Sequence, residues 1–247
     1  MQTTSTPLAG ETPQAYYNGF VVVDDTGIQR GTITVLANQF ELPCFAEDTT
    51  IRMSDGTEML VQTIQPGDSV QTLGGAAQNV LWVGKRKLSK FELDTKPELL
   101  PIKVSRGSLG PSMPNEDLFV SPQHRLLVRS SVVYRMFEEA EVLVPAKLLL
   151  EAKGIEAFTP TNGITYYHIL LESHAVIWAN GAEAESLLLG PEARSIFTAQ
   201  QAAEIEAKDL GDNSALARLV PPNKRMKKLI ERHIKNGVPF QAAREYA

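Results

Sequence analysis

Short runs of apolar and β-branched residues, separated by turn-forming residues, recur through the central part of the chain. Asp-Gly, Pro-Gly-Asp and Gly-Gly sequences stand between the runs. Many short strands joined by turns are typical of an all-β sheet or barrel rather than of alternating strands and helices. The runs that we predict to be strands are 58–64, 69–73, 79–83, 101–104, 118–120, 125–128, 164–171 and 175–179.

The stretch from residue 133 to residue 150 follows this pattern less clearly. Residues 138–150 fit a helix, but Pro145 interrupts it. A proline inside a helix removes one backbone hydrogen bond and clashes with the preceding turn. We therefore expect a strand up to residue 144 and a short helix after it.

The N-terminal 43 residues differ from the central part. Residues 1–15 are rich in Thr, Pro, Gln and Gly, which predicts disorder. Two β-branched runs, Phe20–Val23 and 32–36, then flank the turn-forming residues 24–27 and predict a hairpin. Residues 1–43 are thus interpreted as a leader that contains a β-hairpin.

The character of the chain changes again after Gly190. Residues 191–208 are rich in Ala, Glu and Gln, and Pro191 suits a first helical turn. Residues 218–235 carry seven basic residues and one acid, with apolar residues at helical spacing. We expect a helical, basic extension over residues 191–247. Its basic face is either solvated or makes a weak contact with a membrane surface or a protein.

Composition and charge narrow the range of functions. The chain has 247 residues, 43% of them hydrophobic and 21% charged, as in soluble globular proteins. Its net charge of -5 gives it no general attraction for nucleic acid. No apolar run is long enough to span a bilayer, and the N-terminus lacks the pattern of a Sec signal peptide. The compartment and export by a non-Sec route stay open.

Cys44 is the only cysteine of the chain, so an internal disulfide does not explain it. Its thiolate would be the strongest nucleophile among the side chains present. The alternative is a buried cysteine that acts as a small apolar residue. A Ser-Pro-Gln-His sequence at 121–124 and a Tyr-Tyr-His sequence at 166–168 favour the nucleophile.

A cysteine that cleaves its own chain attacks the carbonyl on its N-terminal side, here that of Pro43. The amide becomes a thioester, and the Cys44 nitrogen must gain a proton as it leaves. We predict that His124 donates this proton and that Ser121 orients it, because Pro122 holds both on one turn. His168 is either an assisting residue or part of the packed core.

Three sequence blocks in this order resemble the Hint superfamily, the Hedgehog/intein autoprocessing domains. The first block contains Cys44, Phe45, Thr49, Ile51, Asp55, Gly56, Ile64, Pro66, Gly67, Asp68 and Val70. The second contains Ser121 and His124, and the third contains Tyr167, His168, Ile169, His174, Ala179, Asn180 and Gly181. The resemblance is to bacterial Hint-domain proteins and covers about residues 42–190. It implies a mainly β, horseshoe-shaped fold with pseudo-twofold symmetry.

Departures from the family pattern limit the chemistry that the resemblance implies. Ser121 stands where threonine is commoner, and His168 stands where many inteins carry aspartate. Glu185 and Ser186 stand where an intein ends in His-Asn. Without that asparagine no side-chain amide can cyclise, so splicing is not expected. Thioester formation at Cys44 remains, followed by attack of water, a small thiol or an alcohol.

Two other functions stay open. One is an inactive Hint-fold binding or scaffold module of an exported bacterial protein. The other is a cysteine hydrolase acting on other molecules, but the leader already occupies its attack position. Neither a cofactor nor a metal is expected, because Cys44, His124 and His168 lack the spacing of zinc ligands. We interpret His174 as structural and Asn180-Gly181 as a type I′ hairpin turn.

Overall fold

The computed structural model describes residues 20–23, 29–33, 42–190, 199–206 and 215–242. The chain divides into two compact units, Met1–Gln39 and Phe40–Ala247. In the first unit, β1 (Phe20–Val23) and β2 (Gln29–Ile33) form an antiparallel hairpin. The second strand begins earlier than the run 32–36 predicts. The disorder that we expect for residues 1–15 lies outside the described residues.

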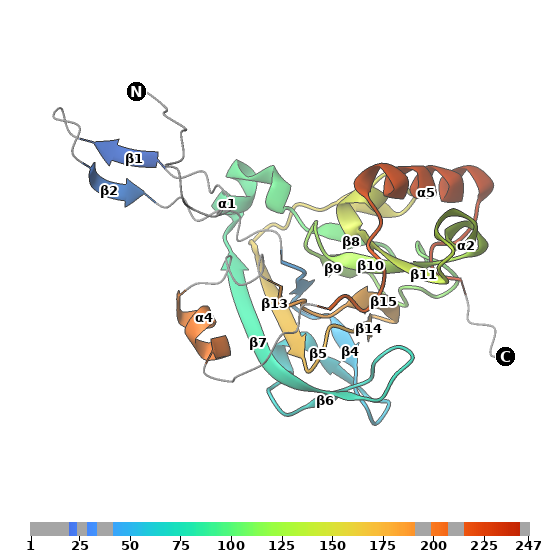
Figure 1. Ribbon diagram of the computed structural model, residues 1–247, viewed down its shortest axis with the longest axis horizontal. Helices are drawn as coiled ribbons and strands as arrows, with labels where there is room; N and C mark the ends of the chain where they lie inside the picture. The colour runs from blue at the N-terminus through green and yellow to red at the C-terminus, as the bar shows by residue number, and fades with distance from the viewer. Residues whose placement is uncertain (1–19, 24–28, 34–41, 191–198, 207–214, 243–247) are drawn as a thin grey trace, which may run out of the picture. The chain divides into compact units, whose positions relative to one another are not determined.

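The second unit is built on two antiparallel sheets (Figure 1). The seven-stranded sheet has the order β12 (Ile155–Ala157), β8 (Ile102–Val104), β9 (Leu118–Val120), β3 (Phe45–Ala46), β13 (Ile164–Leu171), β7 (Gln78–Leu88), β6 (Ser69–Val70). The six-stranded sheet has the order β11 (Glu141–Pro145), β10 (Arg125–Arg129), β15 (Ala182–Glu185), β14 (Val176–Ala179), β4 (Thr50–Arg52), β5 (Glu58–Leu60). The mainly β fold is confirmed, whereas its pseudo-twofold symmetry stays a prediction.

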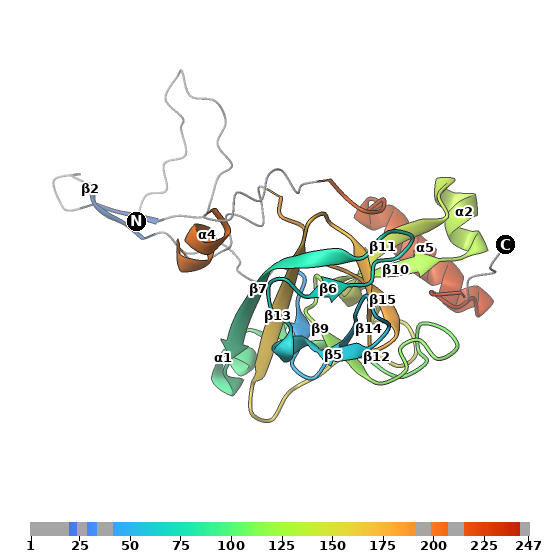
Figure 2. The same ribbon diagram turned by 90° about the horizontal axis from the view of Figure 1, so that it is seen from below.

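The helices are short and lie outside the sheets (Figure 2). The α-helices are α1 (Lys90–Thr95), α2 (Ser131–Phe137), α4 (Ala199–Glu206) and α5 (Asn223–Asn236). The 3-10 helices are η1 (Val61–Thr63), η2 (Pro97–Leu99) and η3 (Ala146–Leu149). The predicted strand followed by a short helix is confirmed by β11 and η3, which meet at Pro145. None of the described helices is both long and apolar enough to cross a membrane.

The turn between β14 and β15 has the predicted type I′ character. Asn180 and Gly181 both have positive φ angles, 45° and 74°, as this turn requires. The Asn180 side chain accepts a hydrogen bond of 2.7 Å from Thr50 N and donates one of 3.0 Å to Asp117 O. The turn therefore also joins the end of this hairpin to β4.

Helix α5 packs its apolar face into the main core of the second unit, as its pattern predicts. Met226, Leu229, Ile230 and His233 are buried, whereas Ile234 is 44% exposed. The basic residues of α5 are exposed. The segment before α5 adds a parallel bridge from Leu219 to β11. The described residues after α5 add a second parallel bridge, to β10.

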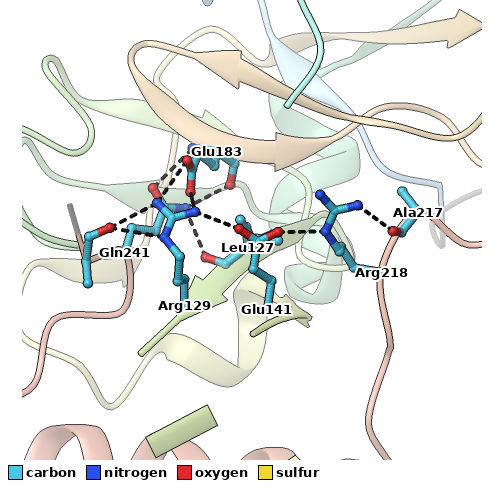
Figure 3. Close-up of polar contacts among 8 residues, drawn as sticks. Leu127, Arg129, Glu141, Glu183, Ala217, Arg218 and Gln241 are labelled. Atoms are coloured by element: carbon cyan, nitrogen blue, oxygen red, sulfur yellow. Dashed lines mark hydrogen bonds and ion pairs between the residues drawn. The ribbon is translucent and has the colours of Figure 1, made fainter. Parts of the chain in front are cut away.

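A partly buried ion network joins this C-terminal region to the six-stranded sheet. Figure 3 shows Arg129 of β10 between Glu141 and Glu183, and Arg218 on the other side of Glu141. Arg129 lies 2.9 Å from a Glu141 oxygen and 3.0 Å from a Glu183 oxygen, and Arg218 lies 2.6 Å from Glu141. The Gln241 amide donates to the carbonyls of Leu127 and Glu183. The network therefore fixes residues on both sides of α5 to strands β10, β11 and β15.

Candidate functional site

Cys44 immediately precedes β3, which lies near the middle of the seven-stranded sheet. Phe45 pairs with Val120 of β9 on one side and with Tyr167 of β13 on the other. Ser121 follows β9 directly, and His168 follows Tyr167 within β13. The strand register therefore brings residues from three distant parts of the sequence to Cys44.

The Ser121 hydroxyl connects the two residues that flank Pro43. Its oxygen accepts a hydrogen bond of 3.0 Å from Cys44 N, and the hydroxyl donates one of 3.0 Å to Leu42 O. Ser121 N also donates to Cys44 O at 3.0 Å. Ser121 thus fixes the backbone on both sides of the bond between Pro43 and Cys44.

His124 contacts Cys44 at a different atom from the one expected. Its Nδ1 lies 3.0 Å from Cys44 O. A carbonyl oxygen only accepts, so Nδ1 carries the hydrogen. The Cys44 nitrogen, which we expected beside His124, instead donates to Ser121. His124 Nε2 is buried without a hydrogen-bond partner, and the Phe45 ring lies 4.3 Å from the imidazole ring.

His168 contacts both the thiol and the carbonyl of Pro43. Its Nδ1 lies 2.9 Å from Pro43 O, and its Nε2 lies 3.5 Å from Cys44 Sγ. Because Pro43 O is only an acceptor, Nδ1 carries the hydrogen and Nε2 presents its lone pair to the thiol. The thiol also lies 3.2 Å from Leu42 O. One neutral imidazole is therefore placed to accept the thiol proton and to polarise the carbonyl.

Burial keeps the three titratable groups of this site neutral. It raises the pKa of the Cys44 thiol to about 12 and lowers the pKa of His124 and of His168 to about 4. The Ser121 hydrogen bond and the charge of Arg86 act in the opposite direction on the thiol. Arg86 lies on β7 and pairs with Tyr166 of β13. Tyr166 stands two residues before His168 on the same strand. Arg86 stands in no sequence motif that points to the site, although alternation along residues 78–88 places it on the same face as Trp82.

Because His124 and His168 are buried in the neutral form, we expect the fold to lose stability in mild acid. The unfolded chain binds two protons near pH 6.5 that the folded chain does not bind until about pH 4. Stability therefore falls as the pH is lowered through this window. At about pH 5 we expect a loss of about 1–2 kcal/mol per histidine relative to about pH 8. Urea unfolding at each pH measures it. The pKa of His233 is also lowered by burial, so His124→Phe should remove only the share of His124, about 1–2 kcal/mol between about pH 8 and about pH 5. An unchanged dependence would contradict the assignment.

A glycine opposite His168 makes room for an aromatic ring. Gly84 pairs with His168 across β7 and β13, and a Cβ at Gly84 would overlap the ring of Trp82. Trp82 Nε1 donates a 3.0 Å hydrogen bond to Glu204 of α4. Helix α4 therefore supports the aromatic residue that packs beside the strand carrying His168. Nothing in the sequence alone points to Gly84 or Trp82 as neighbours of the site.

His174 belongs to a separate polar group. Its Nε2 donates to Glu185 Oε2 at 3.1 Å, and its Nδ1 accepts from Ala217 N at 3.0 Å. Burial opposes ionisation of Glu185, but the His174 hydrogen bond and the charge of Arg125 outweigh it and lower the pKa of Glu185. These contacts agree with the structural interpretation of His174. Among the described residues, no cluster of three or more His, Cys, Asp or Glu side chains is suited to hold a metal ion.

Comparisons with known proteins agree with the sequence blocks. A family described as "Hint domain" matches residues 43–191. Three solved structures are similar: a bacterial intein-like domain from Clostridium thermocellum, a DnaB intein from Synechocystis sp. PCC 6803 and the gp41-1 intein. Their identities are 13%, 12% and 14%, and their TM-scores are 0.41, 0.39 and 0.35. They cover 58%, 58% and 57% of this chain, and 97%, 98% and 97% of their own chains. No curated protein matches the sequence.

Proposed function

The chain belongs to the Hint domain family, and we propose on this basis that Cys44 cleaves the chain on its own N-terminal side. The thiol attacks the carbonyl carbon of Pro43 and gives a thioester between Pro43 and Cys44 Sγ. The observation that carries the proposal is the double contact of His168 with Cys44 Sγ and with Pro43 O.

The proton balance of this step closes within the site. His168 Nε2 takes the thiol proton, and the resulting imidazolium strengthens the Nδ1–H bond to Pro43 O as negative charge develops there. The same proton then passes to the Cys44 nitrogen as the bond from Pro43 C to Cys44 N breaks. In this assignment His168 is the proton carrier, a role that the sequence suggested for His124.

Ser121 and His124 hold the backbone of Cys44 in this mechanism. Ser121 Oγ bonds with Cys44 N, and His124 Nδ1 bonds with Cys44 O, each at 3.0 Å. Because the N–H and the C=O of Cys44 are both hydrogen-bonded, the thiol stays near the Pro43 carbonyl. Little further conformational entropy is then lost when the thiol attacks. We assign positioning roles to both residues.

Water or another small nucleophile resolves the thioester, which ends the covalent link between residues 1–43 and the rest of the chain. The sequence supports cleavage without splicing, because Glu185-Ser186 replaces the His-Asn ending of an intein. The Glu185 carboxylate is buried and bound to His174 and Arg125. Glu185 therefore has a structural role.

One observation favours the alternative, an inactive Hint-fold module. Cys44 is only 7% exposed, and the thiol pKa of about 12 leaves almost no thiolate at neutral pH. A module of this kind would keep its leader covalently attached and use its surface for binding. The two functions differ in whether the chain is cut.

Mass spectrometry of the purified full-length chain, incubated with and without a small thiol, separates them. We expect a product that begins at Cys44, formed faster with the thiol, because the thiol captures the thioester. The variant Cys44→Ala should stay intact under both conditions. A wild-type chain that also stays intact under both conditions would refute the cleavage proposal and leave the inactive module.

A further inference from the structure

Leu42 lies two residues before the nucleophile and is almost completely buried. Its exposed fraction is 6%. It belongs to an apolar group that we call the Cys44 cluster. The members of the Cys44 cluster are Leu42, Cys44, Trp82, Leu88, Leu93, Leu99, Tyr166, Leu170, Leu187, Leu189 and Ile205. The cluster therefore contains both the thiol and a side chain that cleavage would release.

The backbone carbonyl of Leu42 is also bound within the site. It accepts a hydrogen bond from Ser121 Oγ at 3.0 Å, and Cys44 Sγ lies 3.2 Å from it. Pro43, which carries the carbonyl to be attacked, is held between Leu42 and Cys44. Burial of the Leu42 side chain therefore fixes where the Pro43 carbonyl lies relative to the thiol.

We propose that Leu42 is the specificity-determining residue on the acyl side of the reaction. The Cys44 cluster accepts an apolar side chain at this position, and Ser121 binds the carbonyl of the same residue. A polar residue there would bury an unsatisfied group, and a small one would leave the Pro43 carbonyl free to move from the thiol. The inference rests on the proposed cleavage and adds which leader sequence the site accepts.

Three substitutions at Leu42 test the inference. Leu42→Met keeps an apolar side chain of similar volume and should cleave within about threefold of the wild-type rate. Leu42→Ala should be slowed about tenfold or more because the carbonyl is less well held. Leu42→Asn, similar in size but polar, should be at least as slow as the alanine variant. Each rate is measured by mass spectrometry with a small thiol.

A matched control separates this role from stability alone. Leu143 is fully buried, but it lies in another apolar group with Leu73, Leu127 and Val176. Leu143→Ala should lower the melting temperature and leave the cleavage rate of the folded chain unchanged. Cleavage of Leu42→Ala at the wild-type rate would overturn the inference.

A second measurement does not depend on cleavage. Iodoacetamide should alkylate Cys44 about tenfold faster in intact Leu42→Ala than in the wild type, because the Cys44 cluster loses one wall. Leu143→Ala should be alkylated at the wild-type rate. If the wild type is never cleaved, the proposed function fails. Alkylation then still tests whether Leu42 shields the thiol. Equal alkylation rates in the wild type, Leu42→Ala and Leu143→Ala would show that it does not.

Discussion

Replacing His168 with glutamine should slow cleavage at Cys44 about a hundredfold or more. Glutamine keeps a donor for Pro43 O but has no lone pair basic enough to take the thiol proton. General base catalysis by one residue contributes about 100- to 10,000-fold, so its loss should dominate the rate. The cleavage rate is measured at a saturating concentration of the added small thiol.

The pH dependence tests the same role more sharply. In the wild type the proton moves within the site, so the rate should be flat between the pKa values of about 4 for His168 and about 12 for Cys44. In His168→Gln solvent must remove the thiol proton, and the rate should rise about tenfold per pH unit. A wild-type rate that itself rises tenfold per unit would show that His168 is not the base.

The control for this substitution is another buried histidine. His233 of α5 is 1% exposed, stacks on Phe240 and bonds with Ser130 Oγ at 2.9 Å. His233→Phe should lower the melting temperature and leave the cleavage rate of the folded chain unchanged. Equal loss of cleavage in both variants would point to unfolding as the cause.

The second large effect concerns stability and follows from Arg129. Arg129→Met should lower the free energy of unfolding by about 3–5 kcal/mol. The substitution leaves the carboxylates of Glu141 and Glu183 without that guanidinium, and their side chains are only 11% and 4% exposed. Glu141 keeps its contact with Arg218, but both carboxylates lose a guanidinium in a poorly hydrated place, and this loss costs more than the ion pairs contribute. Urea unfolding of the full chain measures the change.

An exposed pair provides the matched control. Lys90 and Asp94 form an ion pair of 2.8 Å on α1, with side chains about half exposed. Lys90→Met should change the unfolding free energy by no more than about 0.5 kcal/mol. If Arg129→Met cost no more than this, the network of Figure 3 would contribute little to stability.

Much of the fold could be predicted because the strand signals are local. Residues 118–120 and 164–171 alternate or run apolar between clear turns, and β9 and β13 have these bounds. Helix α2 was not predicted, because Ser131–Phe137 has only 7 residues, too few for helical periodicity to stand out. Its N-terminus is set by Ser130, whose hydroxyl accepts from Val132 N and Val133 N. The hairpin turn predicted at Asn180-Gly181 implies a strand after it. The bounds of β15 were not predicted, since Ala182–Glu185 carries two acids that only tertiary ion pairs make suitable for burial.

The members of the site could be predicted from the sequence blocks, but the atoms that they contact could not. Which nitrogen of His124 faces which atom of Cys44 depends on the register of β3 against β9 and β13. A shift of one residue would turn these side chains to the other face of the sheet. Arg86 and Gly84 act through the pairing of β7 with β13, which no local motif encodes.

The hydroxyl of Ser121 spans the bond that we propose is cut, with one partner on each side of it. Breaking the covalent bond leaves the hydrogen bond to Leu42 O and the apolar contacts of Leu42 in place. Cleavage and departure of the leader are therefore separate events, with separate rates. A processed chain would run as two fragments in denaturant and still migrate as one particle in native buffer.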